Sequence, residues 1–189
     1  MKFIFDFDDV LFHTNSKFRE NIYSKLGRVG ILPDPIKEYI ERERENKESF
    51  SLKTMVIHFS IEKNLYKEIM DECKNFVNKE LLEIINKIGK ENCFIISYGQ
   101  KEYQQDKIKR AGIASLFSEI KIVLGSKKEA VERICAKYKD EEVIFIDDKA
   151  HHFKDLDFKK YPNLKTILYD EQGLKKMISI TKGQPVKEK

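Results

Sequence analysis

Cysteine is scarce in this sequence of 189 residues, and its three cysteines, Cys73, Cys93 and Cys135, stand far apart. Their spacing lacks the paired pattern of a disulfide framework or a zinc site, so we expect three buried thiols. No apolar run approaches the roughly 18 residues that a membrane crossing needs. The first apolar stretch contains the charged Asp6, which is not typical of a signal peptide. We therefore expect a cytoplasmic protein with no membrane partner.

Glycine-rich linkers, internal repeats and low-complexity tracts are also missing. The net charge of +4 is small beside 36 basic and 32 acidic residues, and the two signs are interspersed. Residues 41–45, which alternate Glu and Arg, are typical of a solvated helix. A nucleic-acid surface would gather basic residues among aromatic ones. The sequence therefore does not favour a nucleic-acid partner, and it leaves the oligomeric state open.

Short continuous apolar runs are present instead, and they predict buried strands. Such runs are expected of parallel strands that helices cover on both faces. The five predicted strands are residues 3–5, 94–96, 120–124, 143–146 and 164–169. Polar–apolar segments of helical length separate the last four strands, with helices predicted over 100–111 and 127–138. Ser126 and Glu129 have the spacing of a capping box at the start of the second helix.

The interval between the first two predicted strands is several times longer than one crossover helix needs. Asp34 followed by Pro35 predicts a helix start within it. An apolar stripe at helical spacing predicts a further helix; its members are Leu65, Ile69, Cys73, Phe76 and Val77. We therefore predict an α/β core of residues 1–14 and 82–189 with a small helical domain inserted at 15–81. The junctions are expected near residues 13–16 and 78–82.

Acidic side chains follow two of the predicted strands. Asp6 and Asp8 come after the first strand and point to the same side of it, because side chains alternate in an extended segment. Asp147 and Asp148 come directly after the fourth strand. Ligands of parallel sheets bind at the carboxyl ends of the strands, where these carboxylates would meet and repel one another. Carboxylate oxygens suit Mg²⁺, so we predict a magnesium site there.

Other polar residues are expected at the same edge of the sheet. Ser97 and then Tyr98 follow the second strand, and a lysine opens the helix after the third. A cation at a helix N-terminus favours phosphate binding. Lys127 and Lys128 both fit this position, and the apolar register of the helix favours Lys127.

Together these segments resemble the haloacid dehalogenase-like (HAD) hydrolases. Residues 3–11 resemble the first motif of the superfamily, Ser97 the second, Lys127 the third, and the pair Asp147 and Asp148 the fourth. The resemblance spans nearly the whole chain. It implies a Rossmann-like parallel five-stranded sheet flanked by helices, and it implies that the insertion is a helical cap.

The resemblance also implies a role for each matching residue. Asp6 would attack phosphorus and form an aspartyl-phosphate, and Asp8 would act as general acid and base. Ser97 and Lys127 would bind the phosphoryl group, with Tyr98 at the mouth of the site. Mg²⁺ would be held by Asp6, the backbone carbonyl of Asp8 and Asp147, with Asp148 orienting its shell. The implied activity is hydrolysis of a small phosphorylated metabolite.

Three alternatives stay open at this point. A phosphotransferase would use the same residues with an acceptor other than water. A binding or regulatory module could retain the fold without activity, and a nucleic-acid end-processing phosphatase is permitted by the mild basicity. Several side chains are interpreted more simply: His13, His151 and His152 as loop residues and His58 as a packing residue. Tyr98 and Gln100 are candidates for the mouth of the site.

Overall fold

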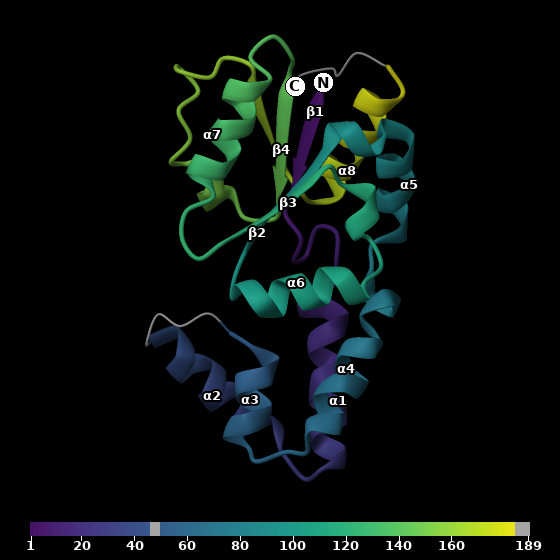
Figure 1. Cartoon of the computed structure of the whole chain (residues 1–189), viewed down its shortest axis with the longest axis vertical. Helices are drawn as coiled ribbons and strands as arrows, with labels where there is room; N and C mark the ends of the chain where they lie inside the picture. The colour runs from purple at the N-terminus through teal and green to yellow at the C-terminus, as the bar shows by residue number, and fades with distance from the viewer. Residues whose placement is uncertain (46–49, 184–189) are drawn as a thin grey trace.

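Five parallel strands form one sheet in the order β3-β2-β1-β4-β5 (Figure 1). The computed structural model describes residues 1–45 and 50–183. Phe3 of the central strand lies opposite Cys93 of β2 and Ile144 of β4. The strands are β1 (Lys2–Phe5), β2 (Cys93–Tyr98), β3 (Glu119–Val123), β4 (Val143–Asp147) and β5 (Leu164–Leu168). The predicted α/β fold, a Rossmann-like parallel five-stranded sheet flanked by helices, is therefore confirmed.

The described helices fall into two groups. The first group precedes β2 and comprises α1 (Arg19–Arg28), α2 (Pro33–Glu45), α3 (Leu52–His58), α4 (Lys63–Asp71) and α5 (Lys79–Ile88). The second comprises α6 (Lys101–Arg110), α7 (Lys128–Lys137) and α8 (Glu171–Thr181). Short helical turns cover Thr14–Phe18, Cys73–Phe76, Lys90–Asn92, Ala114–Leu116 and Ala150–Phe153. None of the described helices combines the length and the apolar character that a membrane crossing requires.

The two faces of the sheet have separate apolar cores, as expected of alternating side chains in a strand that is covered on both sides. Ile4 and Phe145 point to the face of α7, where they pack with Val131 and Ile134. Phe3 and Phe5 point to the other face, which α5 and α8 cover (Figure 1). This second core continues without a break through Phe7, Phe12 and Phe18 into the helices that precede β2.

Two predicted helix starts differ from the structure. Helix α2 begins at Pro33, so Asp34 lies in its first turn and the predicted cap by Asp34 is wrong. Proline is well suited to the first helical position because its φ is already helical and its missing N–H is not needed there. At α7 the N-cap is Lys127, and the hydroxyl of Ser126 accepts from the N–H of Lys128 at 3.1 Å. The donor lies two residues after Ser126, whereas in a capping box it lies three residues after the capping residue.

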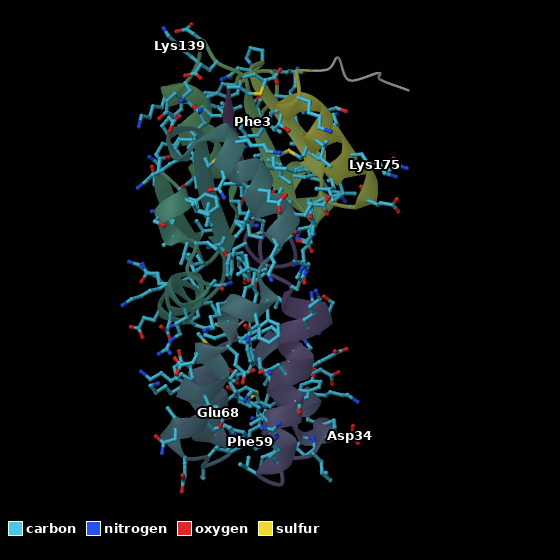
Figure 2. All side chains as sticks on the ribbon, turned by 90° about the vertical axis from the view of Figure 1, so that its right-hand side faces the viewer. Phe3, Asp34, Phe59, Glu68, Lys139 and Lys175 are labelled. Atoms are coloured by element: carbon cyan, nitrogen blue, oxygen red, sulfur yellow. The ribbon has the colours of Figure 1, made fainter. Side chains whose placement is uncertain are left out.

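Helices α1–α4 gather at one end of the molecule, and α6 lies between them and the sheet (Figure 1). Figure 2 shows Phe59 and Glu68 at this end and Lys139 at the opposite end. The two chain segments that lead into and out of the helical end run side by side. The N–H of His13 donates to the carbonyl of Phe76 at 2.8 Å, and that of Asn78 to Leu11 at 2.9 Å. The division of the chain into a core and an inserted cap at 15–81 stays a prediction.

Candidate active site

The ends of β1 and β4 bring two buried carboxylates together. The N–H of Asp6 donates to the carbonyl of Ile146 at 2.9 Å, which fixes Asp6 beside the next acid along, Asp147. Asp6 is 3% exposed and Asp147 is fully buried. The ammonium of Lys127, itself buried, lies 2.8 Å from Oδ1 of Asp6 and 2.7 Å from Oδ2 of Asp147. One buried cation therefore serves two buried anions, which leaves a negative charge to be balanced.

The charge imbalance appears in the protonation of Asp6. Burial raises the pKa of Asp6 to about 7; Lys127 opposes the rise, and the carboxylate of Asp147 adds to it. The pKa of Asp147 lies below its ordinary value, because the bonds from His152, Lys127 and the backbone of Lys149 outweigh the effect of burial. A further cation beside Asp6 would favour its ionised form.

The structure brings Lys127, and not Lys128, to the two aspartates. Lys128 begins α7 with a side chain that is 42% exposed, and its ammonium faces Glu132 one helical turn further on. Lys127 precedes the helix, and its side chain points inward. Its ammonium lies 5.9 Å from the centre of the Phe145 ring. The two lysines are neighbours in the sequence, and they are distinguished by the direction in which their side chains point.

Ser97 and Tyr98 close β2 in different environments. Ser97 is fully buried opposite Ile122 of β3, and its hydroxyl oxygen has no hydrogen-bond partner in the described residues. A buried hydroxyl without a partner is costly, which indicates a place for a ligand. Tyr98 is 44% exposed and lines the cavity described below. Gly99 follows with φ +144°, and a Cβ there would lie 2.9 Å from Nε2 of Gln104.

Gln104 matters because it is one of three side chains that hold Asp8. Its amide donates to Oδ2 of Asp8 at 2.5 Å, and the hydroxyl of Thr14 donates to Oδ1. The ammonium of Lys107 forms an ion pair with the same Oδ1. Burial raises the pKa of Asp8, but the charge and hydrogen bond of Lys107, with the bonds from Thr14 and Gln104, outweigh burial and bring it below its ordinary value.

Sequence reasoning missed Lys107. The residue lies on α6, is 2% exposed, and is surrounded by the rings of Phe7, Phe12 and Tyr103 at 5.1 to 5.2 Å from its ammonium. Its position on the buried face of α6, between Tyr103 and Ile108, was the available signal. A lysine on an apolar helix face needs a counter-ion, but the sequence does not say which acid supplies it.

The acidic residues offer oxygen ligands for a metal. Asp6, Asp147 and His152 place one possible ligand atom each within 4.8 Å of one another. Both oxygens of Asp147 already accept bonds: Oδ1 from the N–H of Lys149 at 2.9 Å and Oδ2 from Lys127. Oδ1 of Asp148 is buried and has no partner among the described residues. The residues present therefore fit a cation with hard oxygen ligands, and among the described residues Asp148 has an oxygen without a partner whereas both oxygens of Asp147 are engaged.

The histidines divide into one that contacts the site and others that lie around it. Nδ1 of His152 is 2.8 Å from Oδ2 of Asp147, a contact that its interpretation as a loop residue did not include. His151 is exposed and stands at the edge of the cavity. His13 is half-buried, and burial lowers its pKa. His58 packs between the rings of Tyr39 and Phe59, each 4.8 Å away.

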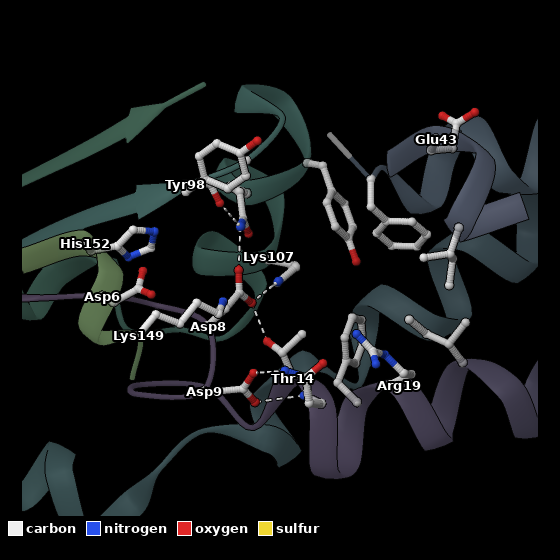
Figure 3. A pocket seen from close by; sticks show the side chains of 18 of the residues that line it. Asp6, Asp8, Asp9, Thr14, Arg19, Glu43, Tyr98, Lys107, Lys149 and His152 are labelled. Carbon is white, nitrogen blue, oxygen red and sulfur yellow. Dashed lines mark hydrogen bonds and ion pairs between the residues drawn. The ribbon is translucent and has the colours of Figure 1, made fainter. Parts of the chain in front are cut away.

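A cavity of about 900 Å³ opens beside these carboxylates (Figure 3). Asp6 and Asp8 line one end, with Tyr98. Side chains from α1 and α2, such as Arg19 and Ile40, line the other end. Gln100, expected at the mouth of the site, instead caps α6 by accepting from the N–H of Tyr103 at 2.6 Å. The cavity thus joins the acidic strand ends to the helical part of the molecule.

Comparison with known proteins gives structural matches only. No protein-family model matches the chain, and no curated protein matches it. A Burkholderia xenovorans protein solved as a haloacid dehalogenase-like hydrolase aligns with a TM-score of 0.64 and 15% identity, over 97% of this chain and 90% of its own. A Bacillus subtilis protein, named as a HAD hydrolase and solved with magnesium bound, aligns at 0.57 and 14%, over 95% and 97%.

A haloacid dehalogenase-like hydrolase of Xanthomonas campestris aligns with a TM-score of 0.54 and 16% identity, over 97% of this chain and 92% of its own. Identities this low speak for the fold and not for the substrate. The alignments cover both the sheet and the helices that precede β2, since nearly all of each chain is matched. The chain therefore has the fold of the haloacid dehalogenase-like hydrolases.

Proposed function

We propose that the protein is a Mg²⁺-dependent phosphohydrolase that acts on a small phosphate monoester through an aspartyl-phosphate on Asp6. The observation that carries the proposal is the grouping at one edge of the sheet of Asp6, Lys127 and Ser97, whose hydroxyl has no partner among the described residues. A nucleophilic carboxylate, a buried cation and a free hydroxyl are what an incoming phosphoryl group requires. The fold and its hydrolase neighbours support this proposal.

In the proposed reaction an oxygen of Asp6 forms a bond to phosphorus as the ester P–O bond breaks, and the leaving oxygen takes a proton from Asp8. Water then attacks the phosphorus of the aspartyl-phosphate and gives a proton to Asp8, and the bond between phosphorus and Asp6 breaks to release inorganic phosphate and the free carboxylate of Asp6. With its pKa lowered by Lys107, Asp8 favours the ionised form, which suits the second half of the reaction. To serve as an acid in the first half, Asp8 has to separate from Lys107.

Asp6, Asp148 and the backbone carbonyl of Asp8 are the proposed magnesium ligands. Asp147, whose oxygens are engaged, then holds Lys127 and His152 in place. When bound, the ion would neutralise charge on the phosphoryl oxygens and hold them in line with Asp6. Helices α1–α4 would act as a cap over the cavity, and interdomain movement is known for the Bacillus subtilis protein.

The test is release of phosphate from a chromogenic aryl phosphate, with magnesium and with a chelator. We expect turnover that the chelator abolishes and that Asp6→Asn reduces by at least about a thousandfold. Asp140→Asn is the matched control, because Asp140 is an exposed aspartate outside the site. Circular dichroism would confirm that both variants are folded.

Absence of turnover in folded wild-type protein would contradict the proposal and favour a binding module. Phosphate transfer that needs an added alcohol acceptor would indicate the phosphotransferase instead. A strong preference for phosphorylated DNA ends would revive the end-processing alternative. Turnover that survives Asp6→Asn would exclude Asp6 as the nucleophile.

A further inference from the structure

The cavity has unlike chemistry at its two ends (Figure 3). Beyond the aspartates, its wall is built by α1, α2, α3, α6 and the segments before α1 and α3, and most side chains of that wall are apolar. Its apolar side chains include Tyr23, Ile40 and Phe50, which are half-buried, and Phe18, Ile22 and Tyr103, which are buried.

Several polar side chains in this region already have partners, although Oε1 of Gln104 is buried without one among the described residues. Thr14, Gln104 and Lys107 all bond to Asp8. The side chain of Asn15 donates to Asp9, another acid of the same loop. A ligand hydroxyl placed against Ile40 or Phe50 would give up its bonds to water without gaining a donor or acceptor from these side chains, which costs binding energy.

Two charged side chains are part of this wall. Arg19 lies on α1 and Glu43 on α2, and both are half-buried at the cavity. Their charges are opposite, so together they give the wall no net charge. The remaining side chains of this part of the wall are mostly apolar, and a strongly anionic leaving group would meet the carboxylate of Glu43 as well as the guanidinium of Arg19.

We propose that the part of the substrate that leaves as an alcohol is aromatic or branched aliphatic, and that Ile40 and Phe50 select it. This inference rests on the proposed function, because it places the phosphate at Asp6. The cavity volume of about 900 Å³ leaves room for such a group beyond the phosphate. Burial of apolar surface against Ile40 and Phe50 would then supply specificity.

The first test compares esters whose leaving alcohols have similar basicity, so that intrinsic reactivity does not decide the result. Benzyl phosphate and cyclohexylmethyl phosphate are set against glycerol 1-phosphate and glucose 6-phosphate, with the full chain and magnesium. We expect kcat/KM to be at least about tenfold higher for the two apolar esters. Equal values, or a preference for the hydroxyl-rich esters, would overturn the inference while leaving the proposed function intact.

The second test changes the wall. Ile40→Asn should lower kcat/KM for benzyl phosphate at least about fivefold and change that for glycerol 1-phosphate less than twofold. Ile61→Asn is the matched control, since Ile61 is a half-buried isoleucine of the same helical region that does not line the cavity. If both variants lower benzyl phosphate turnover equally, the selective role of Ile40 is wrong.

Binding separates this inference from the proposed function. If no ester is hydrolysed, calorimetry with benzylphosphonate and 2-hydroxyethylphosphonate measures the preference of the cavity directly. Tighter binding of benzylphosphonate, weakened by Ile40→Asn, would support an apolar pocket although hydrolysis fails. Equal binding of the two phosphonates would overturn the inference.

Discussion

At the residue scale, the buried ammonium of Lys127 is the charge that two aspartates of the candidate site share. Its ammonium contacts both Asp6 and Asp147, while its neighbour Lys128 reaches only Glu132 at 3.8 Å. The two lysines have the same chemistry and differ only in direction. Substitution of Lys128 is therefore a suitable control for substitution of Lys127.

We expect Lys127→Met to reduce phosphate release by at least about a hundredfold, because the charge beside Asp6 and the phosphoryl oxygens would be lost. Lys128→Met should leave kcat/KM within twofold of wild type. The measurement is steady-state hydrolysis of the aryl phosphate, with thermal unfolding as a check on folding. The opposite ranking of the two variants would assign the role to Lys128.

Ser97 gives a second prediction, in which stability and activity move separately. Its hydroxyl is buried without a partner among the described residues, so Ser97→Ala removes no bond. We expect the free energy of unfolding to stay within about 1 kcal/mol of wild type or to rise, while phosphate release falls. Urea denaturation and steady-state kinetics measure the two effects.

Ser118→Ala is the comparison for Ser97, because the Ser118 hydroxyl donates to the carbonyl of Cys93 at 3.0 Å. This variant should lose stability of about 0.5–1.5 kcal/mol and keep its activity. If Ser97→Ala instead loses stability and keeps full activity, the hydroxyl has a structural role and does not bind phosphate.

At the scale of elements, α6 connects the segment that follows β1 to the helical end. Lys107 and Gln104 of α6 bond to Asp8. On its other side, Asp106 accepts from the hydroxyl of Tyr66 on α4 at 2.8 Å, and Arg110 pairs with Asp71. A movement of α4 relative to α6 would therefore displace Asp106 and Arg110, which lie within one helical turn of the α6 residues that bond to Asp8.

Lys107→Met tests the importance of α6. Loss of this cation leaves Asp8, whose side chain is 20% exposed, without its counter-ion, so we expect a loss of about 2–4 kcal/mol in the free energy of unfolding at pH 7. Because Lys107 lowers the pKa of Asp8, its contribution is present above pH 3.8 and is lost as the pH falls through the pKa of folded Asp8.

Lys109→Met is the control for Lys107, since Lys109 is exposed on the same helix. It should change the free energy of unfolding by less than about 0.5 kcal/mol. Urea denaturation at pH 7 and at pH 3 measures both variants. A loss for Lys107→Met that is equally large at the two pH values would show that packing, and not the ion pair, is responsible.

For the whole molecule, the raised pKa of Asp6 links stability to pH and to magnesium. The folded pKa of about 7 lies above the ordinary 3.8, so in metal-free protein the contribution of Asp6 to stability is full below pH 3.8 and is lost as the pH rises through 7. A bound Mg²⁺ requires the ionised form. We therefore expect magnesium to raise Tm more at pH 8 than at pH 6.

Thermal unfolding with and without magnesium, at both pH values, measures this link. Asp6→Asn lacks the titrating group and should show a smaller magnesium effect that no longer depends on pH between 6 and 8. An equal rise in Tm at both pH values for the wild type would contradict the assignment of the metal to Asp6.

The sheet was predictable from the sequence because its inner strands β1, β2 and β4 are short runs of mostly apolar, buried residues. The ends of the strands were less predictable. Strand β2 extends two residues beyond the predicted end at Ile96, because Ser97 and Tyr98 still pair with β3. Asp6 and Asp147 could be expected to meet because parallel strands share one edge. These inferences depend on local patterns that the fold repeats.

Lys107 and the contact from His152 could not be predicted in the same way. Each depends on how a helix or turn is rotated against the strand ends, which no local pattern encodes. The proposed exchange of metal-ligand roles between Asp147 and Asp148 has the same origin, because it rests on which carboxylate faces Lys127. A sequence motif can identify the residues of such a site, but the contacts of those residues depend on how the helices and strands pack.

The paired junctions of the helical end have a consequence for how this fold can change. His13 bonds to Phe76 and Asn78 to Leu11, so the chain leaves the sheet and returns to it at almost the same place. The entropic cost of closing a loop rises only slowly with its length. The segment between the two junctions could therefore change in length at little entropic cost while Asp6 and Asp147 keep their places, and under the proposed function such changes would alter the choice of substrate.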